Sequence, residues 1–183
     1  DHPEVDFVQL QINYLDWESL AIQSRRCYEV ARNHEKTVTV MEPVKGGALA
    51  SLPASAMEVF EDFYKEARPD KLVPSPASLA IRFAASLEGV TTVLSGMTHL
   101  SQLSDNLSFM EDFKPLDDGE KQLVQRMRDT LNQSLRVQCT GCRYCMEVCP
   151  KNIAIPDYFG LLNMHALTGN KSNMYYQRYS MNH

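Results

Sequence analysis

The sequence of 183 residues lacks the features that mark several common protein classes. No stretch approaches the roughly 18 consecutive apolar residues of a membrane span, and no basic region followed by an apolar one stands at the start. A net charge of −5 with a pI near 5.5 argues against a polyanion-binding surface. We therefore expect a cytoplasmic protein without a nucleic-acid or membrane partner.

Phosphate-binding and histidine-based metal motifs are missing as well. The segment Lys45-Gly46-Gly47 lacks the full G-x-x-x-x-G-K-[ST] and G-x-G-x-x-G patterns, so we interpret it as a loop. The histidines show no i, i+4 ligand spacing, and we expect surface residues without a metal at His2, His34, His99, His165 and His183. There is no low-complexity tract and no internal repeat.

Four of the five cysteines form one run, C-x2-C-x2-C-x3-C-P, at Cys139, Cys142, Cys145 and Cys149. Bacterial ferredoxin segments hold an iron–sulfur cluster with this spacing. In two-cluster ferredoxins the fourth cysteine of such a run binds the other cluster. Because there is only one run here, Cys149 either completes the first cluster or has partners outside this chain. We predict a [4Fe-4S] site at these four cysteines.

Two other interpretations of the cysteines are weaker. Structural zinc normally requires two separated C-x2-C or Cys/His pairs, and no second pair follows Cys149. A disulfide framework suits a small secreted chain, whereas this composition is 44% hydrophobic and sufficient for a core. Cys27 stands apart, on a predicted helix face with Leu20 and Ala31, and we expect it to be a buried thiol.

Hydrophobic periodicity predicts alternating strands and helices before the cysteine run. The predicted strands are 5–12, 37–41 and 90–95. The first three predicted helices are 18–35, 54–67 and a helix from the N-cap Ser75 to Gly89. Three further helices are predicted: one that carries Leu100, Leu103, Leu107 and Met110, one that follows an Asp117/Glu120 capping box, and one that begins at Pro156. The polar, tyrosine-rich segment 170–183 has no core of its own. Strand–helix–strand order implies parallel crossovers.

The predicted fold class is α/β, as the C-terminal part of a (β/α)8 barrel followed by a small, mainly helical segment. A complete barrel takes about 250 residues, and parallel strands need both faces covered. We place a boundary near Gln138, which gives a partial barrel at 1–138 and an iron–sulfur segment at 139–183. Since the chain opens at Asp1 almost directly on a strand, we expect a piece of a longer protein.

Several side chains are expected to serve packing alone. Strand 5–12 should direct Phe7 or Val8 into the core. Amphipathic packing residues are expected at Tyr14, Tyr28 and Tyr64, and core methionines at Met41, Met110 and Met127. The charged stretch 121–129 is interpreted as a solvated helix face.

Three segments in order, VDFVQLQINY, VMEPVKGGALA and SPASLAIRFAASLEGVTTVLSGMTHLSQLSDNL, resemble the sixth, seventh and eighth strand regions of aldo-keto reductases. The cysteine run is similar to the ferredoxin-like extension of one bacterial branch of that family. The resemblance implies a second cysteine run beyond this chain, two [4Fe-4S] clusters, and NAD(P)(H). It also implies a small carbonyl or alcohol substrate and a redox partner protein.

The resemblance also implies which residues contact the nicotinamide cofactor. It places Gln9 against the carboxamide and Met41 and Glu42 beneath the ring. Around the adenosine and its phosphate it places Ser95, Gly96, Met97, Gln102, Asp105 and Asn106. Many relatives have a tyrosine in place of Met41, and NADPH-selective relatives have lysine and arginine in place of Gly96 and Gln102. The choice between NADPH and NADH therefore stays open.

The catalytic tyrosine, lysine, histidine and aspartate of that family lie on its first four strand regions, which this sequence does not contain. We name no catalytic residue and expect the segment alone to be inactive. The leading hypothesis is an iron–sulfur oxidoreductase whose clusters transfer electrons or brace the barrel. One alternative is a non-enzymatic electron-transfer or scaffold module on a barrel that has lost its cofactor. Another is a zinc-bound interaction domain.

Overall fold

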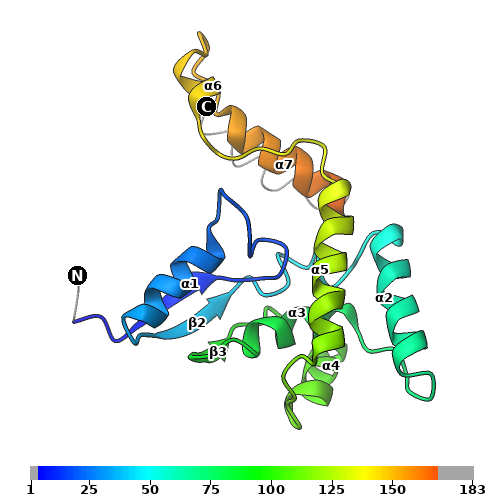
Figure 1. Ribbon diagram of the computed structural model, residues 1–183. Helices are drawn as coiled ribbons and strands as arrows, with labels where there is room; N and C mark the ends of the chain where they lie inside the picture. The colour runs from blue at the N-terminus through cyan, green and yellow to red at the C-terminus, as the bar shows by residue number, and fades with distance from the viewer. Residues whose placement is uncertain (1–3, 169–183) are drawn as a thin grey trace.

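A computed structural model describes residues 4–168 and contains a parallel sheet with helices (Figure 1). The sheet has the order β1-β2-β3, with β1 at Phe7–Gln11, β2 at Thr37–Met41 and β3 at Val90–Val93. The helices are α1 Ser24–Asn33, α2 Ala54–Ala67, α3 Pro76–Ala85, α4 Leu100–Met110, α5 Asp118–Gln133, α6 Tyr144–Glu147 and α7 Ile155–Thr168. Both strand pairs are parallel, which confirms the predicted α/β class. No helix within the described range is long and apolar enough to cross a bilayer.

One face of the sheet is covered by α1 and α3 (Figure 1). Val38 and Val40 of β2 are fully buried against Ala31 of α1 and Ala84 of α3. Val8 packs into the same cluster while Phe7 is 56% exposed, so the Val8 alternative is correct. Because side chains alternate along a strand, the opposite face carries Gln9, Thr39 and Met41. Gln9 and Met41 are exposed there.

The first helix is shorter than predicted, and Cys27 is exposed rather than buried. Before the helix, the Asp16 N–H donates to Asn13 Oδ1 at 2.9 Å, and the Ser19 N–H donates to the Asp16 carbonyl at 2.9 Å. These local bonds hold the chain in turns up to Ser24. The helix then buries Ser24 and Ala31, which places Cys27 on the outer face. The prediction of a buried thiol was therefore wrong.

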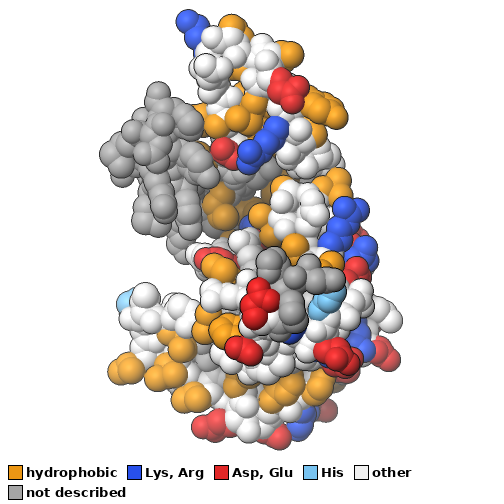
Figure 2. Space-filling view, turned by 90° about the vertical axis from the view of Figure 1, so that its left-hand side faces the viewer, with side chains coloured by type: hydrophobic (Ala, Val, Ile, Leu, Met, Phe, Trp, Pro, Cys, Tyr) orange, Lys and Arg blue, Asp and Glu red, His pale blue; other side chains and the backbone are white. Residues whose placement is uncertain are grey.

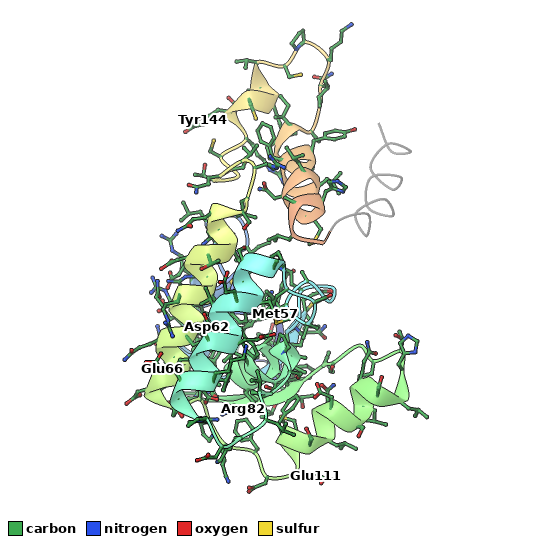
Figure 3. All side chains as sticks on the ribbon, turned by 90° about the vertical axis from the view of Figure 1, so that its right-hand side faces the viewer. Met57, Asp62, Glu66, Arg82, Glu111 and Tyr144 are labelled. Carbon is green, nitrogen blue, oxygen red and sulfur yellow. The ribbon has the colours of Figure 1, made fainter. Side chains whose placement is uncertain are left out.

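The larger core lies between α2, α3 and α5, and a buried carboxylate joins these helices. Glu120 of α5 has no exposed surface. Arg82 of α3 donates to both of its carboxylate oxygens at 2.8 Å, and the hydroxyl of Tyr64 on α2 donates at 3.0 Å. Figure 3 shows α2 beside α5, with Arg82 behind them. The predicted capping box is confirmed, since Asp117 accepts from the Glu120 N–H at 2.8 Å.

Helix α4 has the predicted position, but none of its residues is buried. Leu100 is 85% exposed, and Leu103, Leu107 and Met110 are partly exposed. Figure 2 shows exposed hydrophobic side chains on the lower part of one face of the molecule. Its apolar periodicity therefore faces away from the described core. Of the three methionines expected in the core, Met127 is fully buried, whereas Met41 and Met110 are exposed. Strand alternation turns Met41 to the open sheet face, and Met110 lies on this exposed helix.

The cysteine segment is attached to the rest through α7, beyond the C-terminal end of α5 (Figure 1). The Asn163 side chain donates to the Val137 carbonyl at 2.6 Å and accepts from the Val137 N–H at 3.0 Å. Leu167 packs into the core between α2, α3 and α5. Helix α7 begins next to Pro156, as predicted, while α6 within the cysteine run was not predicted. The predicted polar segment 170–183 lies outside the described residues.

Substitution Glu120→Gln should destabilise the fold by about 3 to 5 kcal/mol, because it leaves the largely buried Arg82 guanidinium without its counter-charge. Asp118→Asn, at a carboxylate that is 90% exposed, is the matched control and should cost less than about 1 kcal/mol. Urea unfolding of both variants measures the difference. Equal urea midpoints for Glu120→Gln and Asp118→Asn would contradict a stabilising role for the buried Arg82–Glu120 ion pair.

The same pair should make stability depend on pH. Burial alone would raise the pKa of Glu120, but the hydrogen bonds and charge of Arg82, with the Asp117 N–H, hold that pKa below its usual value. In the unfolded chain the pKa of a glutamate is about 4.3. Because the pKa of Glu120 is lower in the folded protein, its ionised carboxylate stabilises the fold fully above that pH, and this contribution is lost as the pH falls through the folded pKa. The difference in free energy of unfolding between wild type and Glu120→Gln should therefore become smaller in acid. Urea unfolding at successive pH values measures this difference.

Tyr14→Phe should leave stability unchanged or raise it by up to about 1 kcal/mol. The Tyr14 side chain is 1% exposed, its hydroxyl has no hydrogen-bond partner within the described chain, and burial raises its pKa far above the ordinary value. Tyr64→Phe is the control, since it removes the bond to Glu120 and should cost about 1.5 to 3 kcal/mol. Thermal unfolding compares the two, and a strongly destabilised Tyr14→Phe would reveal a partner for the hydroxyl.

Candidate functional site

The carboxyl ends of the three parallel strands meet at one edge, where the loops after β1, β2 and β3 begin. Ligands of parallel α/β folds bind at this edge. The loop after β2 has an unusual backbone, because Glu42, Lys45, Gly46 and Gly47 all have positive φ angles. Its path lets one loop contribute to pockets on both of its sides.

The first of these, which we call the β3 pocket, has a volume of about 600 Å³ and lies between the loop after β2, the start of α3, the loop after β3, and α4. It collects seven of the nine residues predicted to contact a nicotinamide nucleotide: Glu42, Ser95, Gly96, Met97, Gln102, Asp105 and Asn106. These residues come from two segments that are more than fifty positions apart in the sequence. Tertiary structure thus brings them to one cavity.

Hydrogen bonds hold the polar side chains of the β3 pocket in position. Asn106 donates to the Ser95 hydroxyl at 3.0 Å, and the Ser75 hydroxyl donates to Asp105 at 2.6 Å. Ser75 is also the N-cap of α3, as predicted, and accepts from the Ser78 N–H at 3.1 Å. Gln102 accepts from the backbone N–H groups of the two residues preceding α4, at 2.8 and 3.1 Å. The side-chain oxygen of Gln102 therefore accepts hydrogen bonds at the N-terminus of α4.

The other two predicted contacts, Gln9 and Met41, do not line the β3 pocket. They lie on the open face of the sheet, where the Gln9 amide is 3.5 Å from the Met41 sulfur. The nine predicted residues thus form two groups, one in the pocket and one on the neighbouring strand face. Nucleotide contact by either group stays a prediction.

A buried polar cluster at the same edge was missed by the sequence interpretation. Lys45 Nζ is 2.7 and 2.8 Å from the two carboxylate oxygens of Asp16. Gln11 and Asn13 each donate to the same carboxylate at 2.9 Å. The spacing Asn13-x-x-Asp16 after a strand is an available turn signal, but nothing local connects it to Lys45. The interpretation of Lys45 as a plain loop residue was incomplete.

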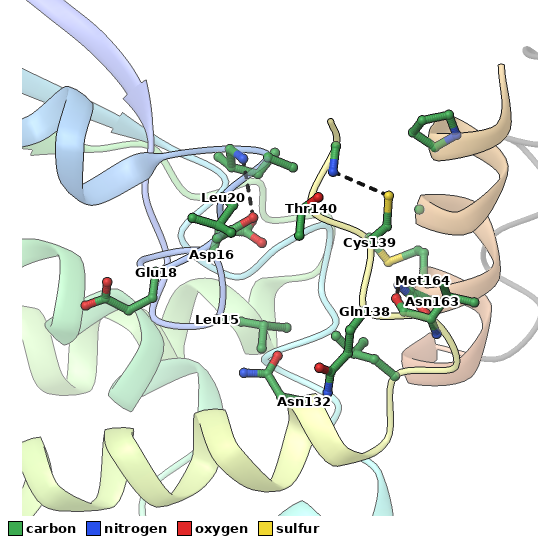
Figure 4. A pocket seen from close by; sticks show the side chains of 18 of the residues that line it. Leu15, Asp16, Glu18, Leu20, Asn132, Gln138, Cys139, Thr140, Asn163 and Met164 are labelled. Atoms are coloured by element: carbon green, nitrogen blue, oxygen red, sulfur yellow. Dashed lines mark hydrogen bonds between the residues drawn. The ribbon is translucent and has the colours of Figure 1, made fainter. Parts of the chain in front are cut away.

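The second pocket, called the cysteine-side pocket, has a volume of about 730 Å³. It lies between the loop after β1, the end of α5, the start of the cysteine segment, and α7 (Figure 4). Asp16, Leu15 and Asn132 line it on one side, with Cys139 and Met164 on the other. Lys45 also faces this pocket, so the loop after β2 separates the two cavities.

The four predicted metal ligands lie near the surface. Cys142 is exposed, and Cys139, Cys145 and Cys149 are half-buried. Backbone N–H groups donate to Cys139 and Cys149 sulfur at 3.4 Å each. The pKa of Cys142 is lowered, first by the Tyr144 N–H and then by the Thr140 hydroxyl. Such donors stabilise thiolates and fit a thiolate-bound metal group.

No group of three or more His, Cys, Asp or Glu side chains in residues 4–168 is placed to hold a metal ion. The chemistry of the donors fits a cluster, while the four sulfurs are not gathered around one point. Cluster binding therefore stays a prediction. The described histidines His34, His99 and His165 lie at the surface, as expected, and His2 and His183 lie outside the described residues.

The tyrosines have the packing roles that were predicted. Tyr14 and Tyr64 are buried in the core between α2, α3 and α5. The Tyr28 ring packs on Trp17 with centroids 5.5 Å apart, and its hydroxyl donates to the Glu88 carbonyl at 2.7 Å. None of the three lines either pocket.

Comparison with known proteins gives a family but no curated relative. Residues 1–129 match the Aldo/keto reductase family. Similar solved structures are the apo and holo forms of aldo-keto reductase AKR11C1 from Bacillus halodurans, at 18% and 20% identity with TM-scores of 0.47 and 0.48. They cover 69% of this chain, which spans 45% and 44% of theirs. No curated protein matches the chain. The family match extends over more than two thirds of the sequence, and the chain therefore belongs to the aldo/keto reductase family.

Proposed function

We propose that the protein is an oxidoreductase that interconverts small carbonyl compounds and alcohols with NAD(P)(H). The observation that supports this is the β3 pocket, which gathers seven predicted nucleotide contacts at the carboxyl edge of the sheet in a chain of this family. A bound nicotinamide would supply or accept the hydride. This chain would supply much of the nucleotide site, and no residue within it is proposed as the catalytic acid.

The described side chains suit the two ends of such a nucleotide. Asn106 and Ser95 form a polar pair that can offer donors and acceptors to the adenosine end. Gln9, an amide on the open sheet face beside Met41, can pair with a carboxamide. Met41 offers a flexible apolar surface for a ring. These roles assign the β3 pocket to the adenosine end and the open face to the nicotinamide.

We also propose that the cysteine run holds a [4Fe-4S] cluster, with Cys139, Cys142 and Cys145 as its ligands and Cys149 on the same or a second cluster. The spacing and the N–H donors to sulfur support this assignment. Residues 139–183 would then form an iron–sulfur segment attached to the barrel portion 1–138. Its clusters would pass electrons to a redox partner protein or brace the fold.

A non-enzymatic electron-transfer or scaffold module is the second candidate. Two observations favour it: Met41 offers no aromatic ring to a nicotinamide, and among residues 4–168 no lysine or arginine lines the β3 pocket. Saturable nucleotide binding separates the two candidates, since the module would bind clusters without nucleotide.

The first test concerns the nucleotide. In protein expressed from the complete gene, NADH or NADPH should bind saturably and be oxidised on addition of an aldehyde. Asn106→Ala should weaken nucleotide binding about tenfold, the value of one lost hydrogen bond. Asn33→Ala, at the exposed end of α1, should leave it unchanged. Fluorescence titration measures both variants, and the absence of saturable binding of either nucleotide would overturn the reductase proposal.

The second test concerns the cluster. Protein purified without air should contain iron and acid-labile sulfide and absorb broadly in the visible range. Cys145→Ser should lose most of this iron, because thiolates are the cluster ligands. Cys27→Ser, at an exposed cysteine outside the run, should retain it. Colourless protein that contains zinc would instead support the zinc-bound interaction domain.

A further inference from the structure

The loop after β2 has a backbone conformation that two of its residues do not favour. Glu42 and Lys45 have φ angles of 56° and 50°, in the left-handed region that residues with a Cβ atom rarely occupy. Gly46 and Gly47 also have positive φ angles, which a glycine adopts at little cost. Residues in such a conformation keep it only where the surrounding structure holds them there. The loop therefore depends on its contacts with other segments.

The two sides of this loop face different pockets. Glu42, Val44, Gly46 and Gly47 line the β3 pocket. Lys45, in the middle of the same segment, lines the cysteine-side pocket instead. The contacts on the Lys45 side therefore determine where the opposite side of the loop lies, and that side is part of the wall of the β3 pocket.

Asp16, in the loop after β1, holds the Lys45 side chain. Lys45 Nζ lies 2.7 and 2.8 Å from the two carboxylate oxygens of Asp16, and Figure 4 draws a dashed line at this carboxylate. The Asp16 side chain is 8% exposed and that of Lys45 is 17% exposed. Gln11 and Asn13 each donate one further hydrogen bond to the same carboxylate. Loss of either partner of the ion pair would leave a largely buried charge without compensation.

Asn13 connects the same carboxylate to the backbone of the loop after β2. The fully buried Asn13 amide donates to Asp16 at 2.9 Å and to the Glu42 carbonyl at 3.1 Å, and its oxygen accepts from the Asp16 N–H at 2.9 Å. The Glu42 carboxylate in turn accepts from the Gly46 N–H at 2.7 Å. Asp16 is thus linked to the loop directly at Lys45 and, through Asn13, at Glu42.

We infer that Asp16 is a positioning residue for the nucleotide site. Its carboxylate fixes the loop after β2 through Lys45 and Asn13, and this loop forms part of the wall of the β3 pocket. The inference rests on the proposed function, in which that pocket holds part of the nucleotide. Within the described chain, none of Asn13, Asp16 and Lys45 lines the β3 pocket. Their effect on nucleotide binding therefore passes through the backbone of the loop.

Four substitutions test this role. Asp16→Asn has nearly the same shape, but it replaces an acceptor oxygen by a donor that opposes the N–H groups of Lys45, Gln11 and Asn13. Lys45→Met keeps a long side chain and removes the counter-charge of Asp16. Lys45→Arg is the conservative variant, because a guanidinium keeps the charge and can bind both carboxylate oxygens. Tyr28→Phe is the control, since it removes a hydrogen bond to a backbone carbonyl outside both pockets.

The first measurement is hydrogen exchange of nucleotide-free protein, expressed from the complete gene and followed by mass spectrometry. Asp16→Asn and Lys45→Met should speed the exchange of amides 46–51 at least about tenfold, because these N–H groups donate to acceptors within the same loop. Exchange in α2 and α5 should stay at its wild-type rate. Lys45→Arg and Tyr28→Phe should keep the wild-type rate in the loop.

The second measurement is a fluorescence titration of the same proteins with NADH and with NADPH. Asp16→Asn and Lys45→Met should weaken the binding of whichever nucleotide the wild type binds by about tenfold, because the wall of the pocket is no longer held in place. Lys45→Arg and Tyr28→Phe should bind within about threefold of wild type. Restoration by arginine at position 45 separates a requirement for the ion pair from a general sensitivity of this loop to substitution.

Each outcome decides a different statement. Faster exchange throughout the chain, including α2 and α5, would mean that the ion pair supports the whole fold, and it would overturn the positioning role. Faster exchange in the loop with unchanged nucleotide affinity would overturn the inference and leave the proposed function intact. If Asp16→Asn does not fold, the comparison of Lys45→Met with Lys45→Arg decides the same question. If wild type binds neither nucleotide, the proposed function fails, and hydrogen exchange alone decides whether Asp16 holds the loop.

Discussion

The arrangement of both pockets depends on the ion pair and hydrogen bonds of the buried Glu120 carboxylate. Arg82 and Tyr64 bring α3 and α2 to this one group on α5. Helix α3 begins at Ser75, which holds Asp105 in the β3 pocket. Helix α5 leads directly into the cysteine segment. The Arg82–Glu120 ion pair therefore connects α3, at the β3 pocket, with α5, whose end lines the cysteine-side pocket.

The loop after β2 divides the carboxyl edge of the sheet into two regions of different chemistry. Glu42 faces the β3 pocket, whereas Lys45 turns to Asp16 on the cysteine-side pocket. The positive φ angles of this loop make the alternation possible within a few residues. The loop therefore separates the β3 pocket from the cysteine-side pocket, which Cys139, the first cysteine of the run, lines.

Two surfaces of the described residues have no packing partner in the core. The open face of the sheet carries Gln9 and Met41, and α4 exposes Leu100 and other apolar side chains. Parallel sheets normally have both faces covered. In the described residues, neither the sheet face that carries Gln9 and Met41 nor the apolar side of α4 is covered in this way.

The sequence by itself determined the features that depend on neighbouring residues. Helix starts at Pro76 and Asp118 follow from the caps Ser75 and Asp117, which need no distant partner. Strand and helix order follows from periodicity, and the cysteine spacing is a local pattern that still predicts a cluster. The nine candidate contacts could be named because they lie in three segments that resemble the family.

Tertiary structure decided which face each element buries and which distant groups meet. Cys27 and Met41 are exposed because packing selected the other face of their helix and strand, and periodicity alone cannot choose between two faces that both carry apolar groups. Lys45 and Asp16 are 29 positions apart, so only the parallel crossover brings them together. The acidic lining of the β3 pocket arises in the same way. Its charged side chains come from segments that are distant in the sequence and become neighbours only in the folded protein.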